Sequence, residues 1–205
     1  MNIEKRSIVI LFVFFLSCGK NIKTVTKVEN MYSKIKKELA PDKRTELFDI
    51  QFHLLNGAII LKGETTSKKA LSRLQDSLKY TQVNFKSEVR ILPDSSLENR
   101  QFAIAKNSVI NIRSNPKHSA ELGTQGLLGM ALRVLDKKGD FYRIQTPDNY
   151  ISWVDKGGIQ RMNKRDFDLW NASKKVLFTN NVGQVFASKN KNSTIISDIT
   201  LGGVL

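Results

Sequence analysis

The side chains that most often carry catalytic chemistry are scarce in this sequence. It contains one cysteine, Cys18, and two widely separated histidines, His53 and His118. A thiol nucleophile needs a histidine beside it and a third polar group to orient that histidine. The zinc pattern HExxH, the serine elbow GxSxG, the phosphate loop GxxxxGK[ST] and the dinucleotide pattern GxGxxG do not occur. We therefore expect a chain that is not an enzyme as it stands and that needs no metal and no cofactor.

The single cysteine follows a pattern typical of export. Lys5 and Arg6 precede nine consecutive apolar residues, Ile8–Leu16, a run too short to span a bilayer. The small residue before Cys18 makes this segment resemble a bacterial lipobox, which implies that residues 1–17 are a lipoprotein signal peptide and that Cys18 is lipidated. The alternative is a buried core cysteine. A lipidated Cys18 would anchor the chain to a membrane in the cell envelope, facing the periplasm, and could not act as a nucleophile.

The net charge indicates what kinds of partner to expect. Lys and Arg number 33 against 19 Asp and Glu, which gives +14, while 40% of the residues are apolar and can form a core. The lysines are scattered over every segment, and no RNA-binding signature with interleaved aromatic residues is present. We expect no nucleic-acid partner; anionic lipid or acidic cell-wall polymer fits the charge better.

Residues 18–94 predict a tether, a helix and a small α+β domain. Gly19–Thr26 is polar and suits a tether, and a short amphipathic helix ends at Pro41, which sets the bounds of this segment at 18–41. Residues 42–94 then read as strand, hairpin turn at Asn56-Gly57, strand, helix and strand. This order resembles the BON-like module of envelope proteins. His53 falls on the polar face of its strand, and we interpret it as a surface histidine.

From residue 100 onward the hydrophobic pattern is all β. Five short apolar stretches alternate with turn signals and predict a small closed barrel over 100–160; they are 103–105, 109–112, 131–135, 142–144 and 150–154. The runs Asn111–Pro116, Gly139–Ile144 and Tyr150–Val154 resemble a bacterial SH3 domain. The run Lys117–Gln125 and the tail Trp153–Ile159 narrow that resemblance to the non-catalytic, N-terminal part of NlpC-type dipeptidyl peptidases, cysteine peptidases that cut gamma-D-glutamyl bonds in cell-wall peptides.

The resemblance and the residue chemistry suggest five ligand-binding candidates. In the resembled peptidases the first SH3-like domain helps to select peptides with a free amino terminus, which implies Glu121 for the ammonium and Tyr150 as an aromatic contact. Arg113 could bind a muropeptide carboxylate in a forked geometry, and Tyr142 and Trp153 are further aromatic candidates. The alternatives are an exposed loop carboxylate for Glu121, a solvated Arg113 and a core position for Trp153.

The last segments predict a connector helix over 161–175, which carries Phe167 and Trp170, and a second repeat. When the sequence is aligned with itself at a shift of 73 residues, Ile195 aligns with Leu122 and Gly202 aligns with Gly129. Residues 176–205 therefore read as a partial second SH3-like domain. Half a barrel buries little surface, so we expect this segment to be mobile or to lie as an added strand on the first barrel. We interpret the chain as truncated, and the alternative is a deliberate short form.

Three functions remain open after the sequence. The first is an envelope lipoprotein whose SH3-like domain binds a cell-wall muropeptide or an envelope protein. The second is a truncated N-terminal portion of a dipeptidyl peptidase without its catalytic domain. The third is a structural adaptor in which the BON-like unit contacts a membrane or another envelope protein.

Overall fold

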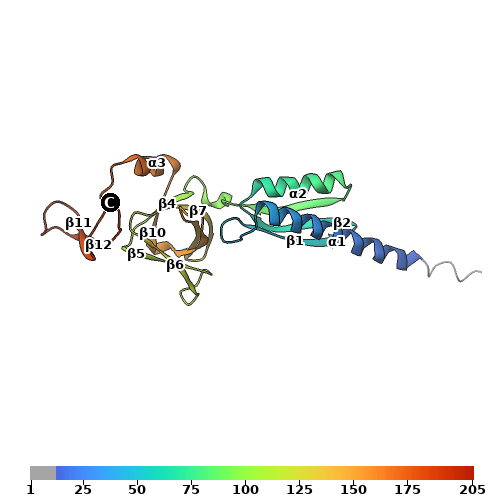
Figure 1. The fold of residues 1–205 in the computed structure, drawn as a ribbon, viewed down its shortest axis with the longest axis horizontal. Coiled ribbons are helices and arrows are strands. Elements are labelled where there is room, and N and C mark those ends of the chain that lie inside the picture. The colour runs from blue at the N-terminus through green and yellow to red at the C-terminus, as the bar shows by residue number, and fades with distance from the viewer. Residues whose placement is uncertain (1–12) are drawn as a thin grey trace, which may run out of the picture. The chain divides into compact units, whose positions relative to one another are not determined.

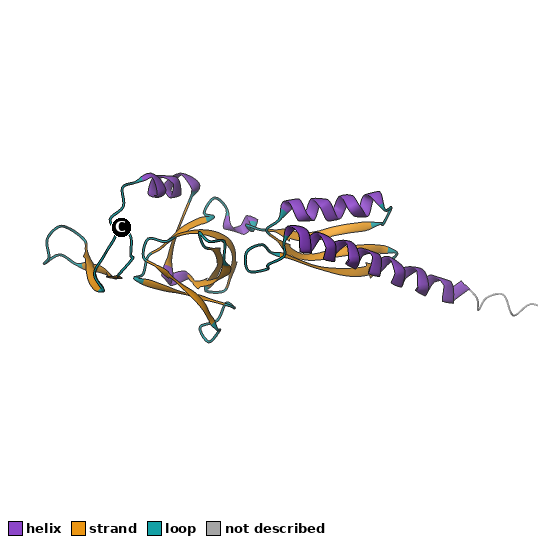
Figure 2. Cartoon of the chain, viewed as in Figure 1, coloured by secondary structure: helices purple, strands orange, loops and turns teal. Residues whose placement is uncertain are grey.

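A computed structural model describes residues 13–205 and divides the chain into two units (Figures 1 and 2). Unit 1 contains the described residues up to Pro41 together with Leu47–Ile91, and unit 2 contains Asp42–Glu46 together with Leu92–Leu205. Most of the predicted signal peptide and the side chain of Cys18 lie outside what the structure describes. Among the helices that are described, none combines the length and the apolar character needed to cross a membrane.

Unit 1 is a three-stranded sheet with two helices. Its elements are α1 (Val13–Leu39), β1 (Phe48–Leu55), β2 (Ala58–Thr65), α2 (Lys68–Tyr80) and β3 (Phe85–Ile91). The sheet order is β1-β2-β3, with β1 antiparallel and β3 parallel to β2. The elements follow the predicted order, and the relation to BON-like modules stays a prediction.

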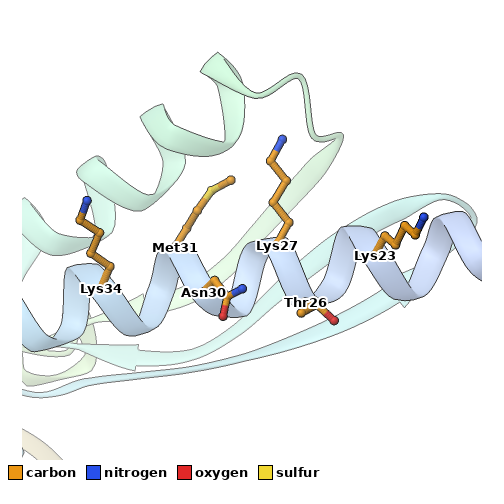
Figure 3. A pocket seen from close by; sticks show the side chains of 6 residues that line it. All are labelled: Lys23, Thr26, Lys27, Asn30, Met31 and Lys34. Atoms are coloured by element: carbon orange, nitrogen blue, oxygen red, sulfur yellow. The ribbon is translucent and has the colours of Figure 1, made fainter.

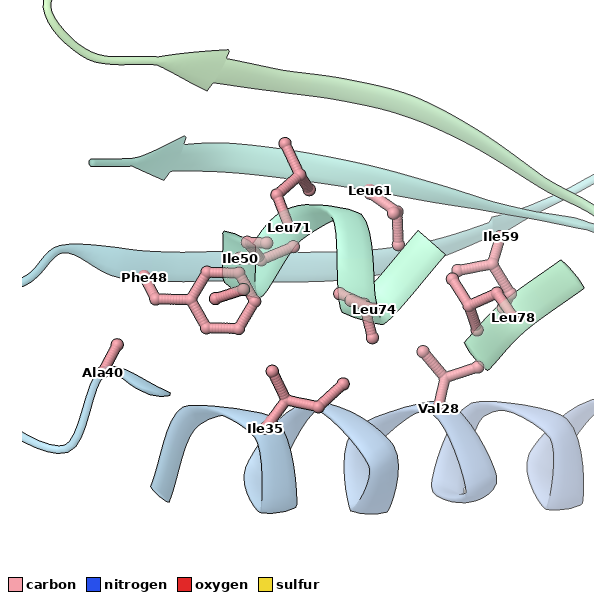
Figure 4. Packing of buried hydrophobic residues seen from close by; sticks show 11 residues of the cluster. Val28, Ile35, Ala40, Phe48, Ile50, Ile59, Leu61, Leu71, Leu74 and Leu78 are labelled. Carbon is pink, nitrogen blue, oxygen red and sulfur yellow. The ribbon is translucent and has the colours of Figure 1, made fainter. Parts of the chain in front are cut away.

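The core of unit 1 lies between the helices and the sheet. Figure 4 shows Val28 and Ile35 of α1 facing Leu74 and Leu78 of α2 and Phe48 of β1. The α2 helix begins at Ser67, whose side chain accepts a hydrogen bond from the Ala70 N–H. The buried residues of α2 are Ala70, Leu71, Leu74 and Leu78, which are spaced to lie on one face of the helix.

The first helix is longer than the sequence suggested. The segment Gly19–Thr26, predicted as a tether, is helical, because α1 runs without a break from Val13. Val25 packs against the unit 1 core one turn before Val28, so tertiary contacts extend the amphipathic stripe toward the N-terminus. Packing of this kind outweighs the low helix propensity of Thr24, Val25 and Thr26.

Unit 2 is built on a seven-stranded sheet that curls round its own core (Figure 2). The strand order is β10-β4-β7-β8-β9-β5-β6. A short 3-10 turn at Ser95–Leu97 precedes the first strand, and another at Lys156–Gly158 connects β9 to β10. The strands are β4 (Phe102–Ala105), β5 (Val109–Arg113), β6 (Leu122–Leu127), β7 (Ala131–Lys138), β8 (Phe141–Gln145), β9 (Ile151–Asp155) and β10 (Ile159–Met162). The mixed α+β class is confirmed, whereas β6 and β10 were not among the five predicted strands.

Helix α3 (Lys164–Ala172) lies within the predicted connector. Asn163 caps it by accepting a hydrogen bond from the Asp166 N–H. The ring of Phe167 stacks on Phe102 of β4, with centroids 4.6 Å apart. The connector is thus fastened to the first barrel by an aromatic pair.

The second repeat reproduces the β5–β6 hairpin of the first. The strands β11 (Val182–Phe186) and β12 (Ile195–Thr200) pair antiparallel, and each has the bounds of β5 or β6 shifted by 73 residues. The pairing slips at the same place in both repeats, between the last two residues of β5 and of β11. The segment forms a two-stranded sheet of its own rather than an added strand on the first barrel.

The turn that follows each hairpin is also repeated. Gly129 and Gly202 both have φ of +86°, a left-handed conformation that favours glycine. In the second repeat the chain continues to Val204, whose N–H donates to the Leu128 carbonyl at 2.9 Å. This bond ties the end of the chain to the first barrel.

Candidate functional site

Three adjacent strands place two arginines beside one tryptophan. Trp153 of β9 lies opposite Arg143 of β8 and opposite Arg113 of β5 in the two strand pairings. Residues directly opposite each other project from the same face of a sheet. The guanidinium of Arg143 lies 4.6 Å from the Trp153 ring centroid, within the range of a cation–π contact.

The Trp153 side chain is buried without belonging to the barrel core. Its exposed fraction is 6%. The next residue, Val154, packs into the core of the barrel together with Ile112 and Ile144. Because side chains alternate along a strand, Trp153 points to the opposite face from Val154. The indole is therefore covered by side chains of that outer face, among them Arg143.

Arg113 fastens the loop that joins β5 to β6. Its Nη1 donates to the Ala120 carbonyl at 2.8 Å, and the Ser114 N–H donates to the Glu121 carbonyl at 3.0 Å. The hydroxyl of Ser152 donates to the Arg113 carbonyl. These bonds hold the loop end that carries Glu121 close to the middle of β9.

The structure brings Glu121 and Tyr150 to the same edge of the sheet. Glu121 is exposed, and among the described residues its carboxylate has no ion-pair partner. The Tyr150 hydroxyl lies over Gly123, two residues further on; a Cβ added at Gly123 would stand 2.5 Å from that oxygen. A side chain larger than hydrogen at Gly123 would displace the phenol, so this glycine is required for the approach.

Arg44 is a neighbour of Tyr150 that the sequence did not reveal. Its carbonyl accepts a hydrogen bond from the Ile151 N–H at 2.6 Å, which places the segment Asp42–Glu46 against β9. The Arg44 side chain forms hydrogen bonds with Asp42, and these bonds hold the pKa of the Asp42 carboxyl at about 2. No local pattern signals this contact, because more than a hundred residues separate its two sides.

Tyr142 lies apart from the two arginines and the tryptophan. It stands opposite Val154 in the β8–β9 pairing and packs against the barrel core. The Arg161 guanidinium lies 5.0 Å from its ring centroid, and Arg161 Nη1 donates to the Tyr142 hydroxyl at 3.3 Å. Of the five predicted ligand-binding residues, Tyr142 and Tyr150 are the two that pack against the barrel core.

A pocket of about 220 Å³ opens beside Arg113. His118 and Asp155 line it, and His118 Nε2 lies 3.5 Å from Asp155 Oδ2 while the imidazole contacts Phe141 at 5.0 Å between centroids. Asn111 adds an amide to the lining. A guanidinium, an amide and a carboxylate in one small pocket provide donors and acceptors for a short peptide. The sequence did not single out Asn111, His118 and Asp155 as binding groups, although these three lie in the runs that resemble an SH3 domain.

The described residues hold no candidate metal site, since nowhere among them do three His, Cys, Asp or Glu side chains gather. His53 is exposed in unit 1, and His118 belongs to unit 2.

Two solved structures resemble the chain at low identity. One is an NlpC/P60 endopeptidase from Photobacterium damselae subsp. piscicida, with 12% identity over 69% of this chain and 32% of that one, at a TM-score of 0.43. The other is NlpC2 from Trichomonas vaginalis, with 8% identity over 51% of this chain and 36% of that one, at a TM-score of 0.27. The chain spans about a third of the length of each. No curated protein matches it.

A protein-family model matches part of unit 2. It describes the bacterial dipeptidyl-peptidase SH3 domain, and it covers residues 112–159. The matched stretch begins in β5 and ends at the start of β10, so it contains Arg113, Glu121, Tyr142, Tyr150 and Trp153. Residues 112–159 therefore resemble the SH3 domain of bacterial dipeptidyl peptidases.

Proposed function

We propose that this chain is an envelope lipoprotein whose SH3 domain binds cell-wall peptides. The match of residues 112–159 to the dipeptidyl-peptidase SH3 domain is the observation that carries the proposal. It falls on the strands that hold Arg113 beside the pocket and Tyr150 beside Gly123. Arg113 is the group for a peptide carboxylate, and Glu121 is the group for a free amino terminus.

Binding, rather than hydrolysis, is the proposed activity. A cysteine peptidase needs a Cys–His pair, and the only thiol of the sequence is Cys18. In this proposal Cys18 carries lipid. Purified protein should therefore release no L-Ala-D-Glu dipeptide from cell-wall peptides above a blank, and a release that scales with protein concentration would contradict the proposal.

Membrane anchoring through Cys18 has support from the surface of α1. Figure 3 shows Lys27, Met31 and Lys34 projecting from one side of this helix, and with Lys23 they line a groove on it. The three lysine side chains have no hydrogen-bond or ion-pair partner among the described residues. Ammonium groups close to a lipid anchor gain from anionic headgroups by about 1 kcal/mol each.

The test is calorimetric titration with L-Ala-γ-D-Glu-L-Lys, with its amino terminus either free or acetylated. The free peptide should bind with saturation, and acetylation should weaken binding about tenfold or more because it removes the charged partner of Glu121. Glu121→Gln should abolish that difference, and Arg113→Gln should weaken both peptides. Arg133→Gln, an exposed arginine on β7, is the matched control. Absence of saturable binding would refute the proposal.

A second candidate is that the chain serves as the SH3 portion of a dipeptidyl peptidase. The description of the matched family favours it. Sequencing of the DNA downstream of this reading frame discriminates the two functions, because an adjoining frame for a domain with Cys and His would support the peptidase.

A further inference from the structure

The segment Asp42–Glu46 lies along the edge of β9 that also carries Arg113. The residue before β9 bonds to the turn that follows β8, at the other edge, through both its N–H and its carbonyl. Because backbone groups alternate between the two edges of a strand, the N–H of Ile151 points to the edge of β5, where it donates to the Arg44 carbonyl at 2.6 Å. Arg113 stands opposite Trp153, two residues further along β9. Two residues of a strand span roughly 7 Å, so the backbones of Arg44 and Arg113 are near neighbours.

A second hydrogen bond fixes this segment to the sheet. Gln145 of β8, which lies opposite Ile151, donates from its side-chain Nε2 to the Thr45 carbonyl at 3.2 Å. Asp42–Glu46 accordingly belongs to unit 2, although the residues on both sides of it in the sequence belong to unit 1. The strands that hold the candidate site therefore have a neighbour from outside the family match at 112–159.

The Arg44 guanidinium is held in one orientation and is still open to solvent. Asp42 accepts hydrogen bonds from Arg44 Nε at 3.0 Å and from Nη2 at 2.8 Å, and its Oδ1 also accepts from the Arg44 backbone N–H at 2.9 Å. A guanidinium has five N–H donors, and within the part of the chain that the structure describes Nη1 has no hydrogen-bond partner. The Arg44 side chain is 68% exposed. Its free donors can therefore take a planar anion such as a carboxylate.

Tyr150 has both Arg44 and Glu121 in its neighbourhood. Asp42 is the main group that raises the pKa of the Arg44 guanidinium, and Tyr150 acts in the same direction, so the phenol lies within electrostatic reach of that guanidinium. The Tyr150 hydroxyl lies over Gly123, two residues from the exposed Glu121. A basic and an acidic side chain, both exposed, thus lie near one aromatic ring.

These two charges suit a ligand whose ammonium and carboxylate are only a few bonds apart. In a peptide that begins L-Ala-γ-D-Glu, the amino terminus belongs to the first residue. The chain continues through the γ-carboxyl of the second residue, so the α-carboxylate of D-Glu stays free. A peptide with an ordinary α-linkage uses that carboxyl in an amide bond and presents no charge there.

We propose that Arg44 binds the free α-carboxylate of the γ-linked D-glutamyl residue while Glu121 binds the amino terminus. Arg44 is thus a specificity-determining residue that the segment Asp42–Glu46 supplies, and Arg113 is left for the carboxylate at the end of the peptide. This role rests on the cell-wall peptide binding proposed above and adds to it the recognition of one functional group.

The test compares L-Ala-γ-D-Glu-L-Lys with the same peptide amidated at the D-Glu α-carboxyl, by calorimetric titration into the full chain. Amidation should weaken binding about tenfold in the unaltered chain, since it removes the charge that Arg44 binds. In Arg44→Gln the two peptides should bind equally. Asp42→Asn/Arg44→Gln should give the same result, which excludes repulsion by an unpaired Asp42 as the cause. Arg73→Gln is the matched control, because it removes an exposed, ion-paired arginine of unit 1, and it should keep the tenfold difference.

The Ile151 amide reports whether the segment stays in place, because it donates to the backbone carbonyl of Arg44. Its exchange should be as slow in each variant as in the unaltered chain. Equal binding of the two peptides by the unaltered chain would overturn this role of Arg44 and leave cell-wall peptide binding standing. A preference that survives in Arg44→Gln, or one that is lost only together with the protection of Ile151, would overturn it as well. Absence of saturable binding of either peptide would overturn the proposed function and this role together.

Discussion

The guanidinium of Arg143 lies 4.6 Å from the centroid of the Trp153 ring, and the two residues stand opposite each other in the β8–β9 pairing. The indole is thus covered on the outer face of the sheet while the next residue of β9 fills the barrel. One strand therefore contributes to the core and to the candidate site at the same time.

Trp153→Ala should lower the free energy of unfolding of unit 2 by about 3–5 kcal/mol, since it removes a large buried ring and leaves a cavity. Arg143→Gln should cost less than Trp153→Ala, and the loss of its cation–π contact contributes about 0.5–1 kcal/mol of that cost. Denaturant unfolding, monitored by amide exchange in β8 and β9, measures the loss of stability in both variants. Arg133→Gln is the control, and equal effects of all three substitutions would contradict this account.

The pair of Asp42 and Arg44 makes a prediction about pH. Hydrogen bonds from the Arg44 side chain, and then from its N–H, lower the pKa of Asp42 from 3.8 to about 2. A carboxyl whose pKa is lowered on folding stabilises the fold above its unfolded pKa, and this contribution is lost as pH falls through about 2. Carboxyl NMR titration should give that low value, and Arg44→Gln should raise it toward 3.8. A value near 3.8 in the unaltered chain would show that the pair does not form in solution.

Gly129 and Gly139 both have positive φ, but only Gly129 has a backbone atom close enough to clash with an added side chain. Substituting alanine at each position therefore distinguishes the cost of backbone strain from the cost of a steric clash. Gly129 has φ of +86°, and a Cβ there would stand 2.2 Å from the Val204 carbonyl oxygen. Gly139 has φ of +56° and open space around it. Gly139→Ala should cost about 1–2 kcal/mol of stability from strain alone. Gly129→Ala should cost more and should also speed amide exchange at Val204, which Gly139→Ala should leave unchanged.

Lipidation of Cys18 is predicted from the apolar run before it and from the lone thiol. Growth with an alkyne-tagged fatty acid should label the unaltered protein, and Cys18→Ser should abolish the label. The Cys18→Ser variant should also be absent from the membrane fraction. An unlabelled protein that retains residues 1–17 would contradict the prediction.

The sequence predicted the parts of the fold that depend on local pattern. The sequence identified the hairpin turn at Asn56-Gly57 and the order of strands and helix in residues 42–94. Strand β6 escaped prediction because Leu122–Leu127 contains two glycines and no apolar alternation. It forms because β5 offers it a pairing edge, and such a tertiary cause leaves no local signal.

The candidate site could be predicted in its residue types but not in its grouping. The sequence identified Arg113, Trp153, Glu121 and Tyr150 as candidates. Strand register decides which of these side chains share a face of the sheet and which lie at its edge. Arg44 was missed because its contact with Ile151 joins distant segments. A one-residue change of register would exchange the faces of every side chain on β9, which is why the position of Tyr142 required a structure.

The bond from Arg113 to the Ala120 carbonyl has a consequence for cleavage by proteases. In the second repeat Phe186 stands where Arg113 stands in the first, and a phenyl ring cannot donate to the loop between its strands. That loop exposes Lys189 and Lys191, whereas the loop held by Arg113 contains Lys117. Because a protease must pull a loop into extended form before it cuts, brief digestion with trypsin should nick the second loop first, and Arg113→Gln should make the two loops comparably sensitive.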